Sequence, residues 1–237
     1  MKLICFPYAG ATAASFMKWK KNFDEIQIIP IDPPGRGKRM AEPLYKTIKE
    51  MVDDVNVQLL MLIHPDEPYA VYGHSMGSII TFELLHELLK TEFPMPVHIF
   101  LSGRNPPHFK VEKPIYQLDD DEFIKKILEM GGMEAQFFEN PLLAKMFLPI
   151  LRADLEALDN YRYEKKKQQL PVDMTFFFAS DDGALDIHYI TQWNEYISGS
   201  FQMYSYTGGH FFIFNHEEEI TKIIQETLSD NQEIIAY

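Results

Sequence analysis

Short apolar segments alternate with segments of helical spacing along most of this chain. The apolar segments are residues 3–6, 26–31, 69–72, 97–101, 174–179 and 201–206. Near-continuous apolar runs of this length are typical of strands that are buried on both faces of a sheet. Between them, apolar residues recur every three or four positions, as in residues 47–63 and 217–228, and helices are also expected around residues 13–23 and 188–197. This alternation predicts an α/β fold with a mostly parallel central sheet flanked by helices.

One long segment interrupts the alternation. Residues 104–169 contain no clear strand, and within them acidic residues from Asp119 onward begin a helix that Gly131-Gly132 ends. Because long structureless loops are uncommon in compact domains, we expect a helical lid over the carboxyl edge of the sheet, where α/β enzymes bind ligands. The alternative is a helical subdomain with a purely structural role. The chain length of 237 residues favours a single domain, residues 1–237, that contains this insertion.

The pentapeptide Gly73-His74-Ser75-Met76-Gly77 matches the pattern Gly-x-Ser-x-Gly. The match alone is weak, but it directly follows a predicted strand and directly precedes a predicted helix, as the motif requires. Glycine on both sides permits a sharp turn with a strained residue at its tip. The serine then lies at a helix N-terminus, where the dipole favours developing negative charge. We therefore interpret Ser75 as a nucleophile; a plain tight turn is the alternative.

A serine hydroxyl needs a general base, which an acidic residue orients. In folds with this strand–turn–helix motif the order along the chain is Ser, then Asp or Glu, then His. His210 follows Gly208-Gly209 and the last predicted strand, so its loop can bring the imidazole over the sheet edge. His216 opens the final helix, and the side chain of His74 should leave the turn in a different direction from that of Ser75. The remaining histidines are interpreted as structural: His64, His86, His98, His108 and His188.

The acid should follow a strand between Ser75 and His210. The predicted strand 97–101 ends without a carboxylate, whereas strand 174–179 is followed by Ser180-Asp181-Asp182-Gly183. Asp182 is the candidate and Asp181 the alternative, because either carboxylate could instead hold the turn through hydrogen bonds to backbone N–H groups. Spacing leaves both possibilities open.

A tetrahedral intermediate requires two hydrogen-bond donors for its oxyanion. One candidate is the backbone N–H of Met76, the residue after the candidate nucleophile. The second is the N–H of Ala9, in the loop of residues 7–12 that follows the first predicted strand. Small residues there would allow the backbone to approach a substrate. An ordinary strand–helix loop is the alternative.

Composition excludes several classes of function. A net charge of −13 with no basic run longer than residues 165–167 argues against binding to nucleic acid or to an anionic membrane. No dinucleotide fingerprint, phosphate loop or metal-ligand spacing is present, so we expect no metal and no cofactor. Cys5 is the only cysteine, which favours a reducing compartment. The apolar run at the N-terminus is too short for a signal peptide, and no run is long enough to span a membrane. We expect a cytoplasmic monomer.

Nearly the whole chain resembles the type II, free-standing thioesterases that accompany nonribosomal peptide and polyketide synthetases. The similar segments are residues 3–10, 33–37, 73–77, 128–133, 148–154 and 208–212. The chain departs from the family at Ala11, Ser78 and Ala179, where the family commonly has smaller residues. The resemblance implies an α/β-hydrolase fold and favours Asp182 over Asp181, because the family's aspartate lies three residues after a small residue at the strand end.

The resemblance also implies a substrate class. Such enzymes hydrolyse acyl or aminoacyl thioesters on the phosphopantetheine arm of acyl and peptidyl carrier proteins, which removes misprimed or stalled groups. The partners would then be carrier protein domains. Two alternatives stay open: a serine esterase or lipase that acts on free small esters, and a non-catalytic binding protein on a hydrolase scaffold. The intact serine, histidine and aspartate in the expected order argue against the second.

Overall fold

Six parallel strands form the centre of the protein in this computed structural model, which describes residues 1–109, 114–131 and 135–235. The strands are β1 (Lys2–Phe6), β2 (Gln27–Pro30), β3 (Tyr69–His74), β4 (His98–Ser102), β5 (Asp173–Ala179) and β6 (Phe201–Tyr206). Their order in the sheet is β2-β1-β3-β4-β5-β6, and each neighbouring pair is parallel. The predicted α/β fold with a mostly parallel sheet is confirmed.

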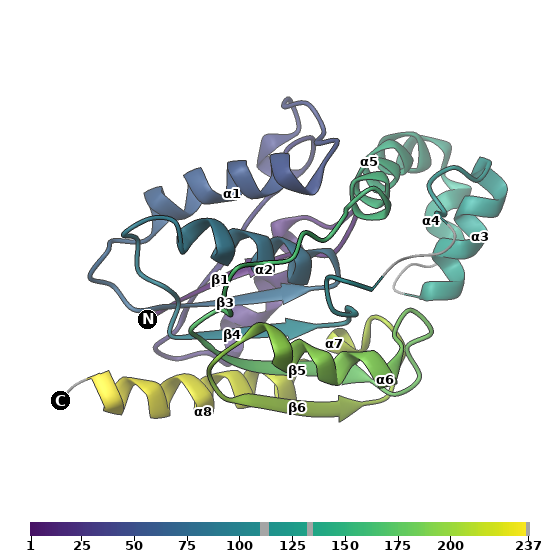
Figure 1. Cartoon of the computed structure of the whole chain (residues 1–237). Coiled ribbons are helices and arrows are strands. Elements are labelled where there is room, and N and C mark those ends of the chain that lie inside the picture. Colours follow the sequence, from purple (N-terminus) through teal and green to yellow (C-terminus); the bar gives the residue numbers. More distant parts are fainter. Residues whose placement is uncertain (110–113, 132–134, 236–237) are drawn as a thin grey trace.

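Helices cover both faces of this sheet (Figure 1). Helices α1 (Ile48–Leu62) and α2 (Met76–Leu88) lie on one face. The 3₁₀ helix Ala13–Asn22 and α8 (Glu217–Ile235) lie on the other. Because side chains of a strand point alternately to opposite faces, Ile4 and Phe6 of β1 join one core, and Leu3 and Cys5 join the other.

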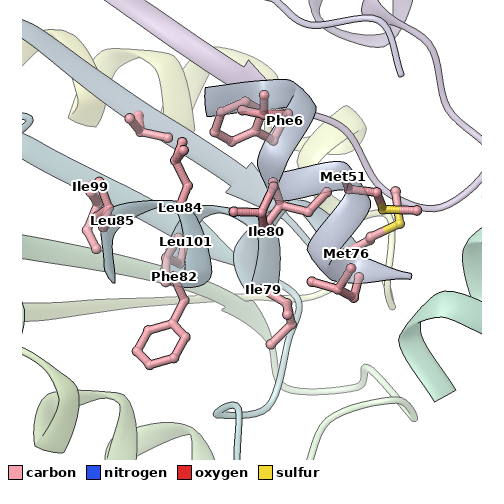
Figure 2. Close-up of a cluster of buried hydrophobic side chains, with 14 of the residues drawn as sticks. Phe6, Met51, Met76, Ile79, Ile80, Phe82, Leu84, Leu85, Ile99 and Leu101 are labelled. Atoms are coloured by element: carbon pink, nitrogen blue, oxygen red, sulfur yellow. The ribbon is translucent and has the colours of Figure 1, made fainter. Parts of the chain in front are cut away.

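The core beneath α1 and α2 is densely apolar. Figure 2 shows Phe6 from β1, Met51 from α1 and Ile80 from α2 gathered there. Helix α2 is buried along almost its whole length, which is the environment that its apolar composition requires. The strand that precedes it, β3, is buried at every residue. The connection between them is therefore held on all sides by packed elements, and this connection carries Ser75.

Two helical segments differ from the expected regular helices. Residues 13–22 form a 3₁₀ helix, which begins where the hydroxyl of Thr12 accepts a hydrogen bond from the N–H of Ala14. The segment expected to be one helix at residues 188–197 is divided into α6 (Ile187–Ile190) and the 3₁₀ helix Thr191–Tyr196. There the indole of Trp193 is fully buried and donates to the carbonyl of Arg104, so tertiary contacts determine the local helix geometry.

In the described part of the segment between β4 and β5, three helices lie beyond the carboxyl ends of the strands (Figure 1). They are α3 (Asp120–Met130), α4 (Ala135–Glu139) and α5 (Pro141–Asp159). The side chain of Asp119 accepts from the N–H of Glu122 at the start of α3, and Gly131 follows its last residue with a φ of 79°. Both ends of this helix match the sequence prediction, although Gly132 lies outside the described residues. A short helix, α7 (Phe212–Asn215), precedes α8.

Candidate active site

Ser75 lies at the tip of a sharp turn between β3 and α2. Its φ of 53° is the only positive φ of a non-glycine residue among the residues described. The turn is tight because a Cβ on Gly73 would lie 2.4 Å from the carbonyl oxygen of Gly77, and one on Gly77 would lie 2.2 Å from that of Phe6. The N–H of Ser75 donates to the carbonyl of Ser102 on the neighbouring strand, at 2.8 Å. The surrounding backbone thus holds Ser75 in a strained conformation with its hydroxyl toward the carboxyl edge of the sheet.

The side chains of Ser75, His210 and Asp182 form one hydrogen-bonded chain. The Oγ atom of Ser75 lies 3.0 Å from Nε2 of His210, and Nδ1 of His210 lies 2.8 Å from Oδ2 of Asp182. All three residues are buried, with exposed fractions of 5 to 7%. His210 comes from the loop after β6 and Asp182 from the turn after β5. The structure therefore brings together the three side chains that the sequence analysis selected.

Asp181 has a different position from Asp182. Its carboxylate accepts hydrogen bonds from the N–H groups of Gly208 and Gly209, at 3.0 to 3.1 Å. These bonds hold the pKa of the exposed Asp181 carboxyl below its usual value. Gly209 directly precedes His210. Asp181 thus anchors the loop that carries the histidine, while Asp182 contacts the imidazole itself.

The side chain of His74, expected to leave the turn in a different direction from that of Ser75, packs against His210 and Ser102. The centre of its ring lies 5.2 Å from that of His210, and its Nδ1 lies 2.8 Å from Oγ of Ser102. Burial, followed by repulsion from His210, lowers the pKa of His74 well below the ordinary histidine value. The ring is therefore a neutral support beneath His210. The only sequence signal for this role was the position of His74 directly before Ser75.

Of the two expected oxyanion donors, Ala9 borders the same cavity as Ser75, and Met76 directly follows Ser75 in the chain. Met76 is the first residue of α2, and Ala9 lies in the turn after β1. In the described parts of the chain, neither backbone N–H donates to another protein group. A free N–H at each position is what an oxyanion site requires.

A mainly apolar cavity of about 110 Å³ lies above Ser75 and His210. Its floor includes Tyr8 and Ala9 from the turn after β1. Its roof comes from α3 and α5, through Ile127, Met130, Phe147, Leu151 and Leu155. A chain of carbon atoms bound at Ser75 would therefore meet side chains of the β4–β5 insertion.

Ser78, one of the departures from the family pattern, has a clear structural role. Its hydroxyl lies 2.9 Å from the carbonyl oxygen of Gly73 and 3.0 Å from that of Ser102. It therefore links the start of α2 to β3 and β4 beneath the turn that carries Ser75. A glycine or alanine at this position lacks both bonds, so the serine reinforces the turn without changing the reacting groups.

The described residues contain neither a candidate metal cluster nor a helix suited to a membrane. No group of three or more His, Cys, Asp or Glu side chains is arranged to hold a metal ion there. None of the helices in those parts of the chain has the length and apolar character that crossing a bilayer demands.

Comparison with known proteins shows which family the sequence matches. Residues 1–228 match the thioesterase domain family. The Homo sapiens protein named S-acyl fatty acid synthase thioesterase, medium chain, is 34% identical over 92% of this chain and 83% of its own length. A Brevibacillus parabrevis protein named linear gramicidin dehydrogenase LgrE is 33% identical over 95% of this chain and 87% of its own. The solved structure of ClbQ from the colibactin NRPS/PKS pathway is 28% identical, with 98% of each chain covered and a TM-score of 0.92.

The family match covers all six strands and the turn of Ser75, and the sheet order and helical layers agree with the expected α/β-hydrolase fold. This chain therefore belongs to the thioesterase domain family.

Proposed function

We propose that this thioesterase hydrolyses acyl or aminoacyl thioesters on the phosphopantetheine arm of carrier proteins, and so clears misprimed or stalled groups from a nonribosomal peptide or polyketide synthetase. The observation that carries the proposal is the hydrogen-bonded chain of Ser75, His210 and Asp182 beneath an apolar cavity in a thioesterase fold. The similarity to ClbQ, whose pathway is an NRPS/PKS pathway, supports the substrate class.

The chemistry follows from the arrangement of these atoms. The Oγ of Ser75 attacks the thioester carbonyl carbon while Nε2 of His210 takes the hydroxyl proton. The N–H groups of Met76 and Ala9 stabilise the oxyanion. When the tetrahedral intermediate collapses, the C–S bond breaks and His210 gives its proton to the leaving thiolate. His210 then activates a water molecule that releases the acid from the acyl-enzyme, and Asp182 keeps Nδ1–H of His210 in the required tautomer throughout.

The insertion contributes the acyl-binding side of the site. We propose that residues 104–169 act as a lid within a single domain, because α3 and α5 supply the roof of the cavity above Ser75. The reacting groups all come from the sheet side. Carrier-bound substrates would then differ from free esters in their contacts with the lid and with its rim.

An esterase for small free esters would use the same three side chains and is the main alternative. A dehydrogenase, suggested by the name of LgrE, would need a dinucleotide site, and the sequence contains no Gly-x-Gly-x-x-Gly motif. Nothing in the geometry favours this reading over acyl transfer to Ser75.

The test is the intact mass of an acetyl-loaded carrier protein incubated with wild type, Ser75→Ala and Ser180→Ala. Ser180 is an exposed neighbour of the Asp181–Asp182 turn, so Ser180→Ala serves as the matched control. We expect wild type and Ser180→Ala to remove the acetyl group faster than from a free acetyl thioester. Loss of the nucleophile should reduce the rate by at least about 10³-fold.

Other results would separate the alternatives. A carrier that stays loaded while a free ester is cleaved would contradict the proposed substrate and favour the small-ester hydrolase. Full activity of Ser75→Ala would contradict the assignment of the nucleophile.

A further inference from the structure

A buried ion pair joins the lid to the body of the protein beside the active site. Arg36 lies in the loop after β2, and Asp154 lies on α5. Their side chains form two parallel bonds of 2.5 and 2.6 Å and are only 3% and 1% exposed. Neither residue belongs to the chain of Ser75, His210 and Asp182. In the sequence, both residues lie in segments that resemble the thioesterase family, and no role was expected for either.

The ion pair also binds the turn that carries Ala9. The N–H of Gly10 donates to Oδ2 of Asp154 at 2.7 Å, and the guanidinium of Arg36 donates to the carbonyl of Ala11 at 3.4 Å. Two successive residues of the turn are thus held by the two ends of the pair. Packing adds a third contact, because a Cβ on Gly10 would lie 2.8 Å from the ring of Phe147 on α5.

The geometry of the turn shows what the hydrogen bond from Gly10 to Asp154 determines. The N–H of Ala11 donates to the carbonyl of Tyr8 at 3.1 Å, and Gly10 has a φ of 80°, the value of the third residue in a type II turn. Type I and type II turns differ by rotation of the central peptide unit, here that between Ala9 and Gly10. A charged acceptor for the N–H of Gly10 favours one orientation of that unit. The adjoining N–H of Ala9 stays without a protein partner within the described residues.

Stability alone does not explain a pair of this kind. Two charges removed from water lose their hydration, and apolar side chains of similar volume often stabilise a core equally well or better. An apolar pair, however, could not accept from Gly10 or donate to Ala11. The polar pair is needed where those two backbone groups must be held in place.

We propose that Arg36 and Asp154 are positioning residues for catalysis: they fix the turn of residues 8–11 so that the N–H of Ala9 meets the oxyanion, and they join that turn to α5. The inference rests on the proposed function. It predicts that the oxyanion site is complete only while this part of α5 is seated on the body. A movement of α5 would then also displace the N–H of Ala9, because Asp154 links the helix to the turn.

The test replaces the pair with apolar residues, Arg36→Met with Asp154→Leu, which keeps the core filled but removes both bonds to the turn. We expect a thermal unfolding midpoint near that of wild type and a KM for the acylated carrier that changes little. The value of kcat should fall roughly 10- to 100-fold, the size of effect that a displaced donor produces. Affinity for an alkylboronic acid, which forms a tetrahedral adduct with Ser75, should fall by a similar factor.

Two single variants complete the design. Asp154→Asn keeps an oxygen acceptor for Gly10 and should retain more of kcat than the double variant. Arg39→Met is the matched control, because Arg39 follows β2 as Arg36 does, but it is paired with Glu42 and with Asp54 on α1 and does not bind the turn. It should keep wild-type kcat and boronate affinity even if its unfolding midpoint falls.

Unchanged kcat and boronate affinity in the folded double variant would overturn the inference. If the double variant does not fold, unchanged boronate affinity in Asp154→Ala would overturn it, and a matching loss would support it. Boronate binding reports on Ser75 and its oxyanion donors whatever the acyl substrate is. A wild-type protein that binds the boronate but leaves acylated carriers intact would therefore refute the proposed substrate and still allow the positioning role to be measured.

Discussion

At the scale of single residues, two adjacent aspartates have separate tasks. Asp182 points into the site and contacts His210, whereas Asp181 points away and holds Gly208 and Gly209. The sequence could not separate the two, because both follow the same strand within two positions. The direction of each side chain depends on the twist of the turn after β5 and on where the loop after β6 lies. Only the assembled sheet places that loop.

Asp182→Asn should reduce kcat by about 10⁴-fold with little change in stability, because an amide in place of the carboxylate favours the wrong tautomer of His210. Asp181→Asn should leave kcat within a few-fold of wild type. Steady-state kinetics of both variants on one acylated carrier measure the difference. Equal losses, or a larger loss in Asp181→Asn, would contradict the assignment.

The hydrogen bonds of Asp181 also predict a dependence of stability on pH. The pKa of Asp181 is lowered in the folded protein by the N–H groups of Gly209 and Gly208, so its charged form contributes stability above the unfolded pKa of 3.8. That contribution is lost as the pH falls through the lower folded pKa. Wild type should unfold at a higher temperature than Asp181→Asn at neutral pH, and the gap should narrow below about pH 4. If the difference in unfolding temperature between wild type and Asp181→Asn increased in acid, the expected stabilisation by the charged Asp181 would be contradicted.

His74 shows how a buried histidine can serve the site without titrating. Its pKa is lowered first by burial and then by the charge of His210. It therefore stays neutral in the proposed mechanism, in which His210 becomes an imidazolium. A second positive ring with its centre 5.2 Å away would oppose that charge. Neutrality of His74 is thus a physical requirement of the arrangement.

At the scale of elements, close backbone contacts fix the position of the connection from β3 to α2. The approach of Gly77 to Phe6 on β1 places a helix start directly against a neighbouring strand. Local propensity explains the strand and the helix separately, and the glycines explain how the two can meet. Which strand the helix start meets was not predictable from the pentapeptide, because it depends on the position of β1 next to β3 in the sheet.

Gly77→Ala should therefore destabilise the protein by about 1–3 kcal/mol or more, the usual cost of overpacking, and should displace Ser75 enough to reduce kcat. The new methyl group would meet a backbone carbonyl that cannot rotate away. Gly183→Ala is the control, because a Cβ there has nothing within 4 Å. Denaturant unfolding and kinetics of both variants test the contrast. Equal stability of the two variants would contradict the close contact.

At the scale of the whole molecule, α5 divides into an exposed and an anchored half. Leu142 and Met146 are 73% and 55% exposed, whereas Leu151 and Leu158 are 5% and 4% exposed and Asp154 is paired with Arg36. The proposed lid would therefore have one end fixed beside the turn of residues 8–11. Movement would then be largest toward the N-terminal half of α5.

Hydrogen exchange measures this division. Amides of residues 151–159 should exchange much more slowly than those of residues 143–147, because opening of the anchored half exposes Leu151 and Leu158 and separates the buried ion pair. The Arg36→Met/Asp154→Leu variant keeps the apolar packing. The difference in exchange rate between the two halves of α5 should therefore decrease only moderately in this variant. Equal protection along α5 in wild type, matched by equal protection across the rest of residues 104–169, would contradict a mobile lid.

The sequence by itself determined the parts of this protein that depend on local pattern. Apolar runs and helical spacing predicted the strands and most helices, because burial on two faces or on one leaves a direct trace in residue order. The turn of Ser75 and the choice of His210 followed from short motifs of glycine, serine and histidine at the ends of predicted strands. Each of these features depends on residues that are close together in the chain.

Only the tertiary structure decided the contacts between distant segments. The pairing of Arg36 with Asp154, the support of His210 by His74 and the separate directions of Asp181 and Asp182 all join residues from different elements. The strand order β2-β1-β3-β4-β5-β6 and the seat of α5 bring them together. Such contacts arise from the packing of whole elements, and so no local pattern in the sequence predicts them.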